Sequence, residues 1–446
     1  MVKQEYKQTE IGMVPVKWSV SDFGSKVKIY RGGSPRPIQD YLTQAQDGIN
    51  WIKIGDVREG DKYITSTEEK IIPAGVARSR TVHAGDFILS NSMSFGRPYI
   101  LNIDGCIHDG WLTIQEYEKT FSKNFLYYLL SSDSVYQQYI SMAAGSSVKN
   151  LNKEKVSALV VAYPDIKEQE RIADALSDID SLIATLEKQI SKKKAIKQGA
   201  MQELLTGKHR LPGFDGKWQS FVFGDLFDFI PNNAFTRAQM DVSGRVKNIH
   251  YGDILTKYGA YISADSKDIP YIAKEIDLSR FSEKCYLQSG DLVIADTAED
   301  ETVGKALEVI NVECPVLAGQ HTLLCRPKVR FAEKFLSYYL NASCYHDQLL
   351  PYIVGTKVSS VSKASIAQTK LVVPKYEEQQ EISSILSDMD NDITALEEKL
   401  AKYRQVKQGM MQQLLTGKIR LTKDIEDSVQ TEQVTSEKAM TLRPVH

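Results

Sequence analysis

Two segments of the chain carry apolar residues at spacings that alternate between four and three. Between residues 164 and 210 the apolar positions are Ile172, Leu176, Ile179, Ile183, Leu186 and Ile190. Between residues 374 and 421 they are Ile382, Leu386, Met389, Ile393, Leu396 and Leu400. Polar and charged side chains fill the remaining faces. This heptad pattern predicts two helices, each about 39 residues or roughly 58 Å long, with one narrow apolar seam.

Both predicted helices carry matching signals along their length. Pro164 and Pro374 stand just ahead of them, where the fixed φ of proline is tolerated. Gly199 and Gly409 interrupt them, at a cost of ~1 kcal/mol each relative to alanine. We therefore expect a bend or a close helix contact at these two glycines.

The two helical segments are copies of one another. Residues 164–211 and 374–421 align without a gap at an offset of 210, and half of the positions are identical. The match continues upstream, where Phe125 pairs with Phe335 and Lys153 with Lys363, and then loosens. The chain therefore consists of two copies of one unit, each a variable globular domain followed by a long helix.

A helix with a single apolar seam has to bury that seam against something. The two seams match in length and phase, so each helix can serve as the partner of the other. Two copies of one unit joined in series most simply close around a pseudo-two-fold axis, which makes the paired helices antiparallel. The alternative is that each seam packs on its own globular domain.

The segments outside the helices show short apolar runs separated by Gly, Pro, Asn and Asp, which is typical of mixed α/β domains of the α+β type. We expect the aromatic residues near 121–142 and 331–350 to be core residues rather than platforms for nucleic-acid bases. The expected organisation is two similar globular domains separated by two long helices that form an antiparallel coiled coil. Its parts are a first domain at 1–163, a helix at 164–210, a second domain at 211–373, a helix at 374–421 and a disordered tail at 422–446.

Composition excludes several classes of protein. No apolar run approaches the ~18 to 20 residues that a membrane span needs, and the polar start is unlike a signal peptide, so we expect a cytoplasmic protein. The five cysteines form no CxxC pair, which argues against disulfides or a zinc site, and His321 with Cys325 is too small a set of metal ligands. The formal net charge of −2 is unusual for a protein that binds DNA unaided.

Several loops carry side chains that suit contacts with DNA. Arginine, lysine and small hydroxyls can bind phosphates, while asparagine and histidine can also reach base edges. Taken singly, each of these loops is better explained as a solvated surface, and only their combination on both globular domains favours DNA binding. The candidate DNA-binding residues are Arg31, Arg36, Ser92, Ser94, Arg97, Ser146, Lys149, Lys153, Arg245, Lys247, Asn248, His250, Thr356, Lys357 and Lys363.

The chain resembles the specificity subunit of type I restriction-modification systems. The resemblance rests on the opening TEIGMVPVKW at Thr9, the Gly-Asp pairs at Gly85 and Gly290, and the KQG-x-MQ-x-LLTGK-x-RL endings at Lys197 and Lys407. It covers nearly the whole chain apart from the tail. The second half lacks the TEIG opening, so the starts of the two domains correspond only approximately.

This resemblance implies that each globular domain recognises one half of a bipartite target in double-stranded DNA. The helices would set the unspecified spacer and dock two methyltransferase subunits, and restriction subunits would complete the assembly. S-adenosylmethionine, ATP and Mg²⁺ would then be bound by those partners, and this chain would bind no cofactor or metal. A clamp shared with partners would also explain the weak net charge.

Motifs for catalysis are missing from the sequence. There is no GxxxxGK[ST] phosphate loop, no [ND]PP[YF] tetrad for amino methylation and no glycine fingerprint for S-adenosylmethionine. Asp291, Asp296 and Glu299 could be drawn as a nuclease cluster, but acidic loop residues are usually solvated. We therefore expect a non-catalytic subunit. The alternatives are a coiled-coil scaffold for protein partners and, ranked last, an enzyme.

Overall fold

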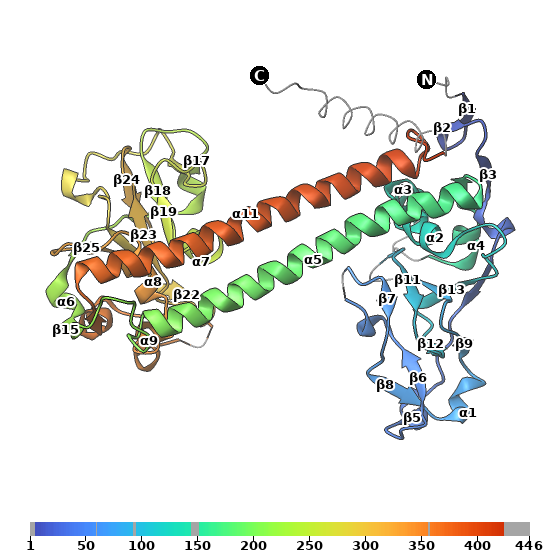
Figure 1. Cartoon of the computed structure of the whole chain (residues 1–446), viewed down its shortest axis with the longest axis horizontal. Helices are drawn as coiled ribbons and strands as arrows, with labels where there is room; N and C mark the ends of the chain where they lie inside the picture. The colour runs from blue at the N-terminus through green and yellow to red at the C-terminus, as the bar shows by residue number, and fades with distance from the viewer. Residues whose placement is uncertain (1–4, 59, 92–94, 144–150, 356, 423–446) are drawn as a thin grey trace, which may run out of the picture. The chain divides into compact units, whose positions relative to one another are not determined.

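The computed structural model describes residues 5–58, 60–91, 95–143, 151–355 and 357–422, and these form two compact units. The first unit contains Met1–Leu186 with Lys399–His446, and the second contains Glu187–Glu398. Helices α5 (Ile166–Leu204) and α11 (Tyr376–Leu414) each have 39 residues and contribute to both units (Figure 1). The two predicted long helices and the mixed helix and sheet content are confirmed.

The first globular domain contains two five-stranded sheets. The strands of the larger sheet are, in spatial order, β4 (Lys28–Arg31), β13 (Trp111–Gln115), β10 (Phe87–Ser90), β11 (Pro98–Leu101) and β7 (Tyr63–Ile64). Only the β11–β7 pair in this sheet is parallel. The strands of the smaller sheet are β5 (Leu42–Thr43), β8 (Glu69–Ile71), β6 (Ile49–Ile52), β12 (Gly105–Ile107) and β9 (Arg80–Val82).

Shorter elements complete the first domain. Two antiparallel strand pairs are formed by β1 (Tyr6–Thr9) with β2 (Gly12–Pro15), which are close in sequence, and by β3 (Ser19–Asp22) with β14 (Val160–Tyr163), which are not. The helices are α1 (Pro73–Val76), α2 (Lys123–Leu130), α3 (Asp133–Ala143) and α4 (Lys153–Ser157). Helix α2 packs on β11, and its Phe125, Leu126 and Tyr128 are fully buried, as expected for core residues.

The second globular domain repeats this plan. The strands of its five-stranded sheet are β16 (Phe227–Ile230), β25 (Thr322–Pro327), β21 (Leu292–Ala295), β23 (Ala306–Ile310) and β19 (Tyr261–Ser263). The strands of its four-stranded sheet are β17 (Met240–Asp241), β20 (Tyr271–Ile272), β18 (Lys247–Ile249) and β24 (Val316–Ala318). Two further strand pairs are formed by β22 (Thr297–Ala298) with β26 (Ser359–Ser360) and by β15 (Gln219–Val222) with β27 (Lys370–Val373). The short helices are α6 (Phe223–Leu226), α7 (Tyr251–Thr256), α8 (Phe335–Leu340), α9 (Ser343–His346) and α10 (Lys363–Gln368).

Within each unit, α5 and α11 run antiparallel. In the first unit Glu168 pairs with Arg420, and Asp180 pairs with Lys407 at 2.6 Å, so positions advance along one helix as they decrease along the other. In the second unit Lys193 pairs with Asp392, and Arg210 pairs with Glu378 at 2.7 Å, which gives the same direction. The predicted antiparallel pairing is confirmed in both units.

The apolar seam is buried along both helices. Its fully buried members are Ile172, Leu176, Ile179, Leu186, Ile190, Ile382, Leu386, Ile393 and Leu400, and its half-buried members are Ile183, Met389 and Leu396. Ile172 and Leu176 share one buried cluster with core residues of their own domain, with Leu414 at the end of α11 and with the adjacent Leu415. The first turns of α5 therefore pack both on their own domain, as the alternative expects, and on the end of α11.

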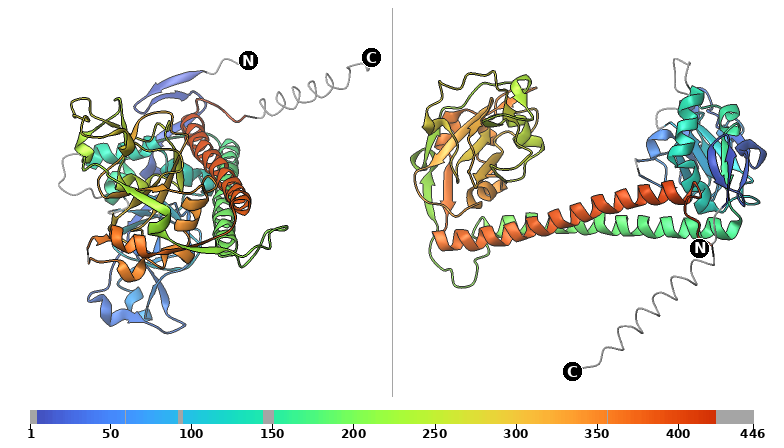
Figure 2. Two further views of the ribbon diagram at one scale, coloured as in Figure 1. Left: turned by 90° about the vertical axis from the view of Figure 1, so that its left-hand side faces the viewer. Right: turned by 90° about the horizontal axis from the view of Figure 1, so that it is seen from above.

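The two mid-helix glycines differ from what we expected of them. Neither interrupts its helix, since α5 and α11 are each continuous α-helices (Figure 2). A Cβ atom added to Gly199 or Gly409 would meet no atom of the described residues within 4 Å. No close contact within the described chain accounts for either glycine.

The ends of the two repeats are built alike. Gly207 and Gly417 have positive φ values of 69° and 70°. A Cβ atom on Gly207 would lie 3.3 Å from the ring of Trp218, and one on Gly417 would lie 3.3 Å from the ring of Trp18. Glycine therefore serves twice here, because it tolerates the left-handed backbone and leaves room for the tryptophan.

Removing a large seam residue tests this packing. We expect Leu176→Ala and Leu386→Ala, which truncate fully buried side chains at matching positions, each to lower the free energy of unfolding by about 2–5 kcal/mol. The matched controls Ile196→Ala and Val406→Ala truncate side chains that are 51% and 40% exposed, so each should change it by less than ~0.5 kcal/mol. Urea unfolding of the isolated chain provides the measurement, and equal losses in both pairs would contradict the assignment of the seam.

Candidate DNA interface

One edge of the larger sheet in the first domain gathers polar and basic residues. Strand β4 ends at Arg31, β13 begins at Trp111, β10 ends at Ser90 and β11 begins at Pro98. Because these neighbours are antiparallel, all four ends lie on the same edge, which we call the first polar edge. The loops that leave this edge carry most of the described candidate residues of the first domain.

Asp109 holds the arginine-rich loop that follows β4. Its Oδ1 accepts a hydrogen bond from the Ser34 hydroxyl at 2.9 Å, and its Oδ2 lies 3.3 Å from Nη2 of Arg36. Burial opposes ionisation of Asp109, but the Ser34 hydrogen bond and the charges of His108, Arg36 and Arg31 outweigh it and lower the pKa of the carboxyl. The carboxylate thus fixes a loop whose Arg36 side chain is 81% exposed.

Two more basic side chains gather beside this loop, around Tyr30. The Arg80 guanidinium lies 4.9 Å and the Lys153 ammonium 6.0 Å from the centre of the Tyr30 ring. Both side chains are exposed, as are Arg31 and Arg36. We call Arg31, Arg36, Arg80 and Lys153 the first basic patch. Arg80 was missed from the sequence because it lies on β9 of the other sheet, and no local motif signals that β9 approaches this edge.

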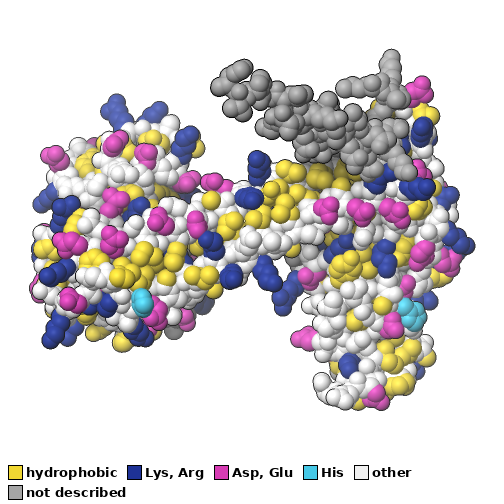
Figure 3. Space-filling view, viewed as in Figure 1, with side chains coloured by type: hydrophobic (Ala, Val, Ile, Leu, Met, Phe, Trp, Pro, Cys, Tyr) yellow, Lys and Arg dark blue, Asp and Glu magenta, His cyan; other side chains and the backbone are white. Residues whose placement is uncertain are grey.

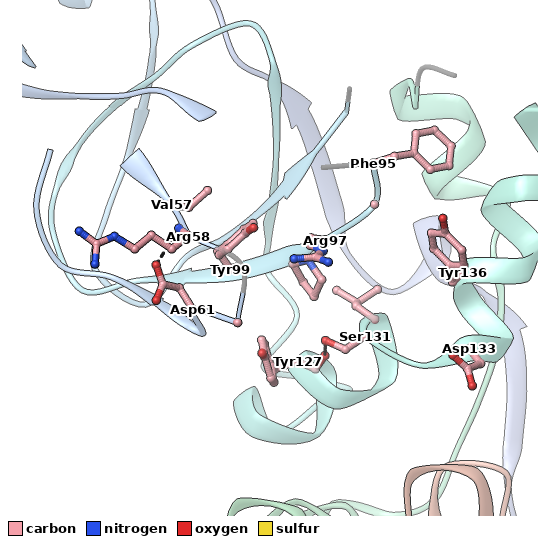
Figure 4. A pocket seen from close by; sticks show the side chains of 14 residues that line it. Val57, Arg58, Asp61, Phe95, Arg97, Tyr99, Tyr127, Ser131, Asp133 and Tyr136 are labelled. Carbon is pink, nitrogen blue, oxygen red and sulfur yellow. Dashed lines mark hydrogen bonds between the residues drawn. The ribbon is translucent and has the colours of Figure 1, made fainter. Parts of the chain in front are cut away.

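Arg97 is exposed and lies just before β11, on the same edge. It lines a cavity of about 680 Å³ together with Arg58, Tyr99, Tyr127 and Tyr136 (Figure 4). In the figure the side chain of Arg97 lies between Tyr99 and the end of α2. The remaining candidates of the first domain, Ser92, Ser94, Ser146 and Lys149, lie outside the described residues.

The corresponding edge of the second domain has different chemistry. Strand β16 ends at Ile230, β25 begins at Thr322, β21 ends at Ala295 and β23 begins at Ala306, and these ends again share one edge, the second polar edge. Beside it, the rings of Tyr251 and His321 meet edge to face with centroids 5.3 Å apart. A tyrosine and a histidine therefore lie beside this edge, whereas arginines lie at the first polar edge.

The structure corrects three candidates of the second domain. Lys247 is buried and donates hydrogen bonds to the carbonyl oxygens of Ala264 and Ser266, both at 2.8 Å. Asn248 is fully buried, and its Oδ1 accepts a hydrogen bond from Asn233 at 2.7 Å. Both lie on β18 inside its sheet, so neither belongs to the surface. His250 is also buried and caps α7, where its Nδ1 accepts a hydrogen bond from the Gly252 amide.

Burial, followed by the charge of Arg237, lowers the pKa of His250 and so favours the neutral form of this ring.

Other candidates of the second domain face solvent. Arg245, Lys357 and Lys363 are exposed, and the Lys363 ammonium lies 4.8 Å from the centre of the Phe229 ring. Thr356 lies outside the described residues.

Sequence reasoning also missed a pair of cations beside α7. The fully buried carboxylate of Asp253 lies 2.9 Å from Nη2 of Arg237 and 3.1 Å from Nζ of Lys257. Both basic side chains are about half exposed, at 53% and 54%. A lysine four residues after an aspartate on a helix is a recognisable signal, but nothing in the sequence indicates that Arg237 returns to the same carboxylate.

The described residues also bear on metal binding, acid catalysis, redox chemistry and membrane insertion. Those residues contain no group of three or more His, Cys, Asp and Glu side chains that could hold a metal ion. Asp291 is buried and paired with Arg326 at 2.6 Å, so Asp291, Asp296 and Glu299 do not form an open acidic cluster. All five cysteines are free thiols. Among the helices that the structure describes, none has an apolar stretch long enough to span a bilayer.

On the face that Figure 3 shows, basic and acidic side chains are intermingled over both globular domains. No broad area of a single charge dominates this face, in line with the net charge of −2.

Comparisons with known proteins agree with this architecture. The chain is 22% identical over 438 residues to the type I restriction enzyme MjaVIII specificity subunit of Methanocaldococcus jannaschii, covering 94% of this chain and 97% of that protein. It is 23% identical over 449 residues to the putative MjaX specificity subunit of the same organism, with the same coverage.

Solved structures share the fold. One chain from a study of complex assembly and conformational transition of the type I R-M system has a TM-score of 0.56 at 16% identity, covering 91% of this chain and 99% of that chain. The type I restriction-modification S subunit from M. genitalium has a TM-score of 0.51 at 14% identity, covering 89% and 96%.

The family model described as the type I restriction modification DNA specificity domain matches the chain twice, at residues 15–196 and 216–407. Each match takes in one globular domain and most of the long helix that follows it. With both halves of the chain accounted for in this way, the protein belongs to the type I restriction-modification DNA specificity family.

Proposed function

We propose that this chain is the non-catalytic specificity subunit of a type I restriction-modification complex and that each globular domain reads one half of a bipartite DNA target. The observation that carries the proposal is the double family match. Each matched segment contains a sheet with a polar edge and, after it, its own copy of the repeated long helix. Repeated helices with divergent edges fit one assembly that recognises two different half-sites.

The first basic patch suits contacts with the DNA backbone. Arg31, Arg36, Arg80 and Lys153 are exposed, and Asp109 holds Arg36 in place before DNA arrives. Ordering a long side chain in advance reduces the entropy lost on binding. In the second domain, Arg237 and Lys257 are held in the same way by Asp253. Base-edge contacts would come from the loops that leave each polar edge.

The long helices would set the unspecified gap between the half-sites. A continuous α-helix is a stiff spacer with a rise of ~1.5 Å per residue, so its length can be converted into base pairs of DNA. Within each unit, the apolar seam and the ion pairs join α5 to α11, so the spacer consists of two paired helices.

The mid-helix glycines suggest where partner subunits dock. Gly199 and Gly409 each cost ~1 kcal/mol, and no contact within the described residues compensates for that cost. The exposed side chains of Ile196 and Val406 lie three residues before them. Both repeats therefore place a glycine, which has no side chain, beside an exposed apolar residue. This combination allows another helix to approach closely. We assign these positions to two methyltransferase subunits.

Restriction subunits would join the same assembly. S-adenosylmethionine, ATP and Mg²⁺ would be bound by the partners, which would carry the catalytic steps. The weak charge of this chain fits a DNA clamp to which the methyltransferase subunits contribute much of the positive surface.

Binding to DNA tests the proposal directly. We expect the isolated chain to bind its target duplex weakly and the complex with methyltransferase subunits to bind it tightly in gel-shift titrations. In that complex, Arg36→Ala should weaken binding to all sequences alike and reduce the slope of log affinity against log salt by about 1. Lys119→Ala is the control, because the exposed Lys119 follows the opposite end of β13. Absence of salt-dependent DNA binding by the complex would favour a protein scaffold instead.

The spacer role can be tested by lengthening both helices. We expect insertion of one helical turn between Ile172 and Ile190, together with the matching insertion in α11, to lengthen the pair by ~5.4 Å. The unspecified gap should then grow by about one or two base pairs at ~3.4 Å each. Sequencing of methylated bases in a host that carries the variant and its partners gives the gap directly. A gap of unchanged length would rule out this role.

Assembly with the methyltransferase tests the docking position. We expect Gly199→Leu combined with Gly409→Leu to weaken assembly at least tenfold, because a leucine side chain blocks close approach of a partner helix. The isolated chain should keep its stability, since both positions open to free space. Gln189→Leu on the exposed surface of α5 serves as the control. Analytical ultracentrifugation of mixed subunits provides the measurement, and unaffected assembly would place docking elsewhere.

A further inference from the structure

In the first unit, a tyrosine of the globular domain is joined to both long helices at one carboxylate. The Tyr128 hydroxyl, on α2, donates a hydrogen bond to Oδ2 of Asp180 on α5 at 2.7 Å. The other oxygen, Oδ1 of Asp180, lies 2.6 Å from Nζ of Lys407 on α11. Three separate parts of the unit therefore meet at a single side chain.

The second unit contains the same arrangement with the roles of the helices exchanged. The Tyr338 hydroxyl, on α8, donates a hydrogen bond to Oδ2 of Asp390 on α11 at 2.7 Å. Oδ1 of Asp390 lies 2.5 Å from Nζ of Lys197 on α5. All three residue pairs are related by the offset of 210. The arrangement has thus been kept in both copies, although the domains around it have diverged.

The surroundings keep the tyrosine hydroxyl of each triad protonated. Tyr128 and Tyr338 are buried, and burial followed by the adjacent aspartate raises the pKa of each hydroxyl well above its ordinary value. Each tyrosine therefore remains a neutral donor. Both aspartate side chains are partly shielded, at 30% and 28% exposure. A charge-assisted hydrogen bond in such surroundings is strong and directional.

Each tyrosine is also coupled to the polar edge of its own domain. Helix α2 packs on β11, and Tyr127, next to Tyr128, lines the cavity that Arg97 borders (Figure 4). In the second domain, Asn341 follows α8 and exchanges two hydrogen bonds with Ala306, the first residue of β23 on the polar edge, at 2.7 and 3.0 Å. A rotation of the domain about its tyrosine would therefore move that edge.

Apolar contact alone would permit such a rotation, because the hydrophobic effect has no direction. A hydroxyl that must point at one carboxylate oxygen, while a lysine occupies the other, removes this freedom. Two other buried tyrosine hydroxyls have partners inside their own domain. Tyr117 donates to the Gly85 carbonyl oxygen, and Tyr345 bonds to Thr369.

We propose that Tyr128–Asp180–Lys407 and Tyr338–Asp390–Lys197 are positioning triads that fix the angle of each polar edge on the paired helices and so make the protein selective for one gap length between half-sites. The inference rests on the proposed function, since it explains how a spacer made of helices is transmitted to the DNA-reading loops.

The test uses the complex with methyltransferase subunits and three duplexes, which carry the native gap, one base pair more and one base pair fewer. The variant Y128F/Y338F removes only the two hydroxyls that reach the aspartates. The control Y117F/Y345F removes two hydroxyls of equally buried tyrosines within the domains. Affinity for each duplex and the melting temperature of each chain are measured together.

We expect the wild-type complex to prefer the native gap and Y128F/Y338F to lose about tenfold in that preference, mostly through tighter binding to the altered gaps. The control should keep the wild-type preference even where its melting temperature falls as far. Equal preference in both variants would overturn the positioning role. A wild-type complex that does not distinguish the gaps would instead contradict the proposed spacer function.

A second set of variants keeps the test decisive if the tyrosine variant folds poorly. K407M/K197M removes the ammonium groups, whereas K407R/K197R preserves a cation beside each aspartate. We expect the methionine variant to lose gap preference and the arginine variant to retain at least half of it. If the methionine and arginine variants show the same gap preference, the lysines have no part in positioning and the proposed triad is overturned.

Discussion

In each unit, one ion pair with a buried carboxylate holds the start of one long helix against the segment that follows the other. Glu168 and Glu378 lie near the starts of the long helices and are almost inaccessible to solvent, at 1% and 3% side-chain exposure. Arg420 and Arg210 each engage one of these carboxylates through two nitrogens. A buried carboxylate without a partner is strongly destabilising. Each helix start therefore requires the segment that follows the other helix, and antiparallel pairing within each unit follows from that requirement.

The two polar edges show one construction principle with different side chains. In the first domain a carboxylate, Asp109, holds Arg36 at the surface, and in the second a buried carboxylate, Asp253, holds Arg237 and Lys257. In both cases the acidic side chain is less exposed than the cations it pairs with, so it orders them rather than contacting DNA itself. The sheets of the two domains thus place their loops in the same way, while the side chains on those loops differ. This suits two domains that recognise different DNA sequences.

The sequence predicted the parts of the structure that depend on periodicity. The spacing of apolar residues predicts both the seam from Ile172 to Ile190 and the core aromatics of α2, and the structure buries them. The surface could not be predicted in the same way. Lys247 and Asn248 lie in a polar stretch but point into a small sheet, and Arg80 and Arg237 reach their sites from distant segments. The positions of these four side chains depend on the path of the backbone through the fold, and no periodic pattern in the sequence indicates that path.

The first unit is assembled from both ends of the chain, whereas the second is continuous from Glu187 to Glu398. Leu414 and Leu415 complete the core cluster that contains Phe125 and Leu176, and Arg420 neutralises Glu168 across 252 positions. During synthesis the first domain therefore emerges first but closes last, after the second unit has all of its residues. Until then its apolar surface stays exposed, and a chain that stopped short of residue 399 would leave that surface exposed permanently.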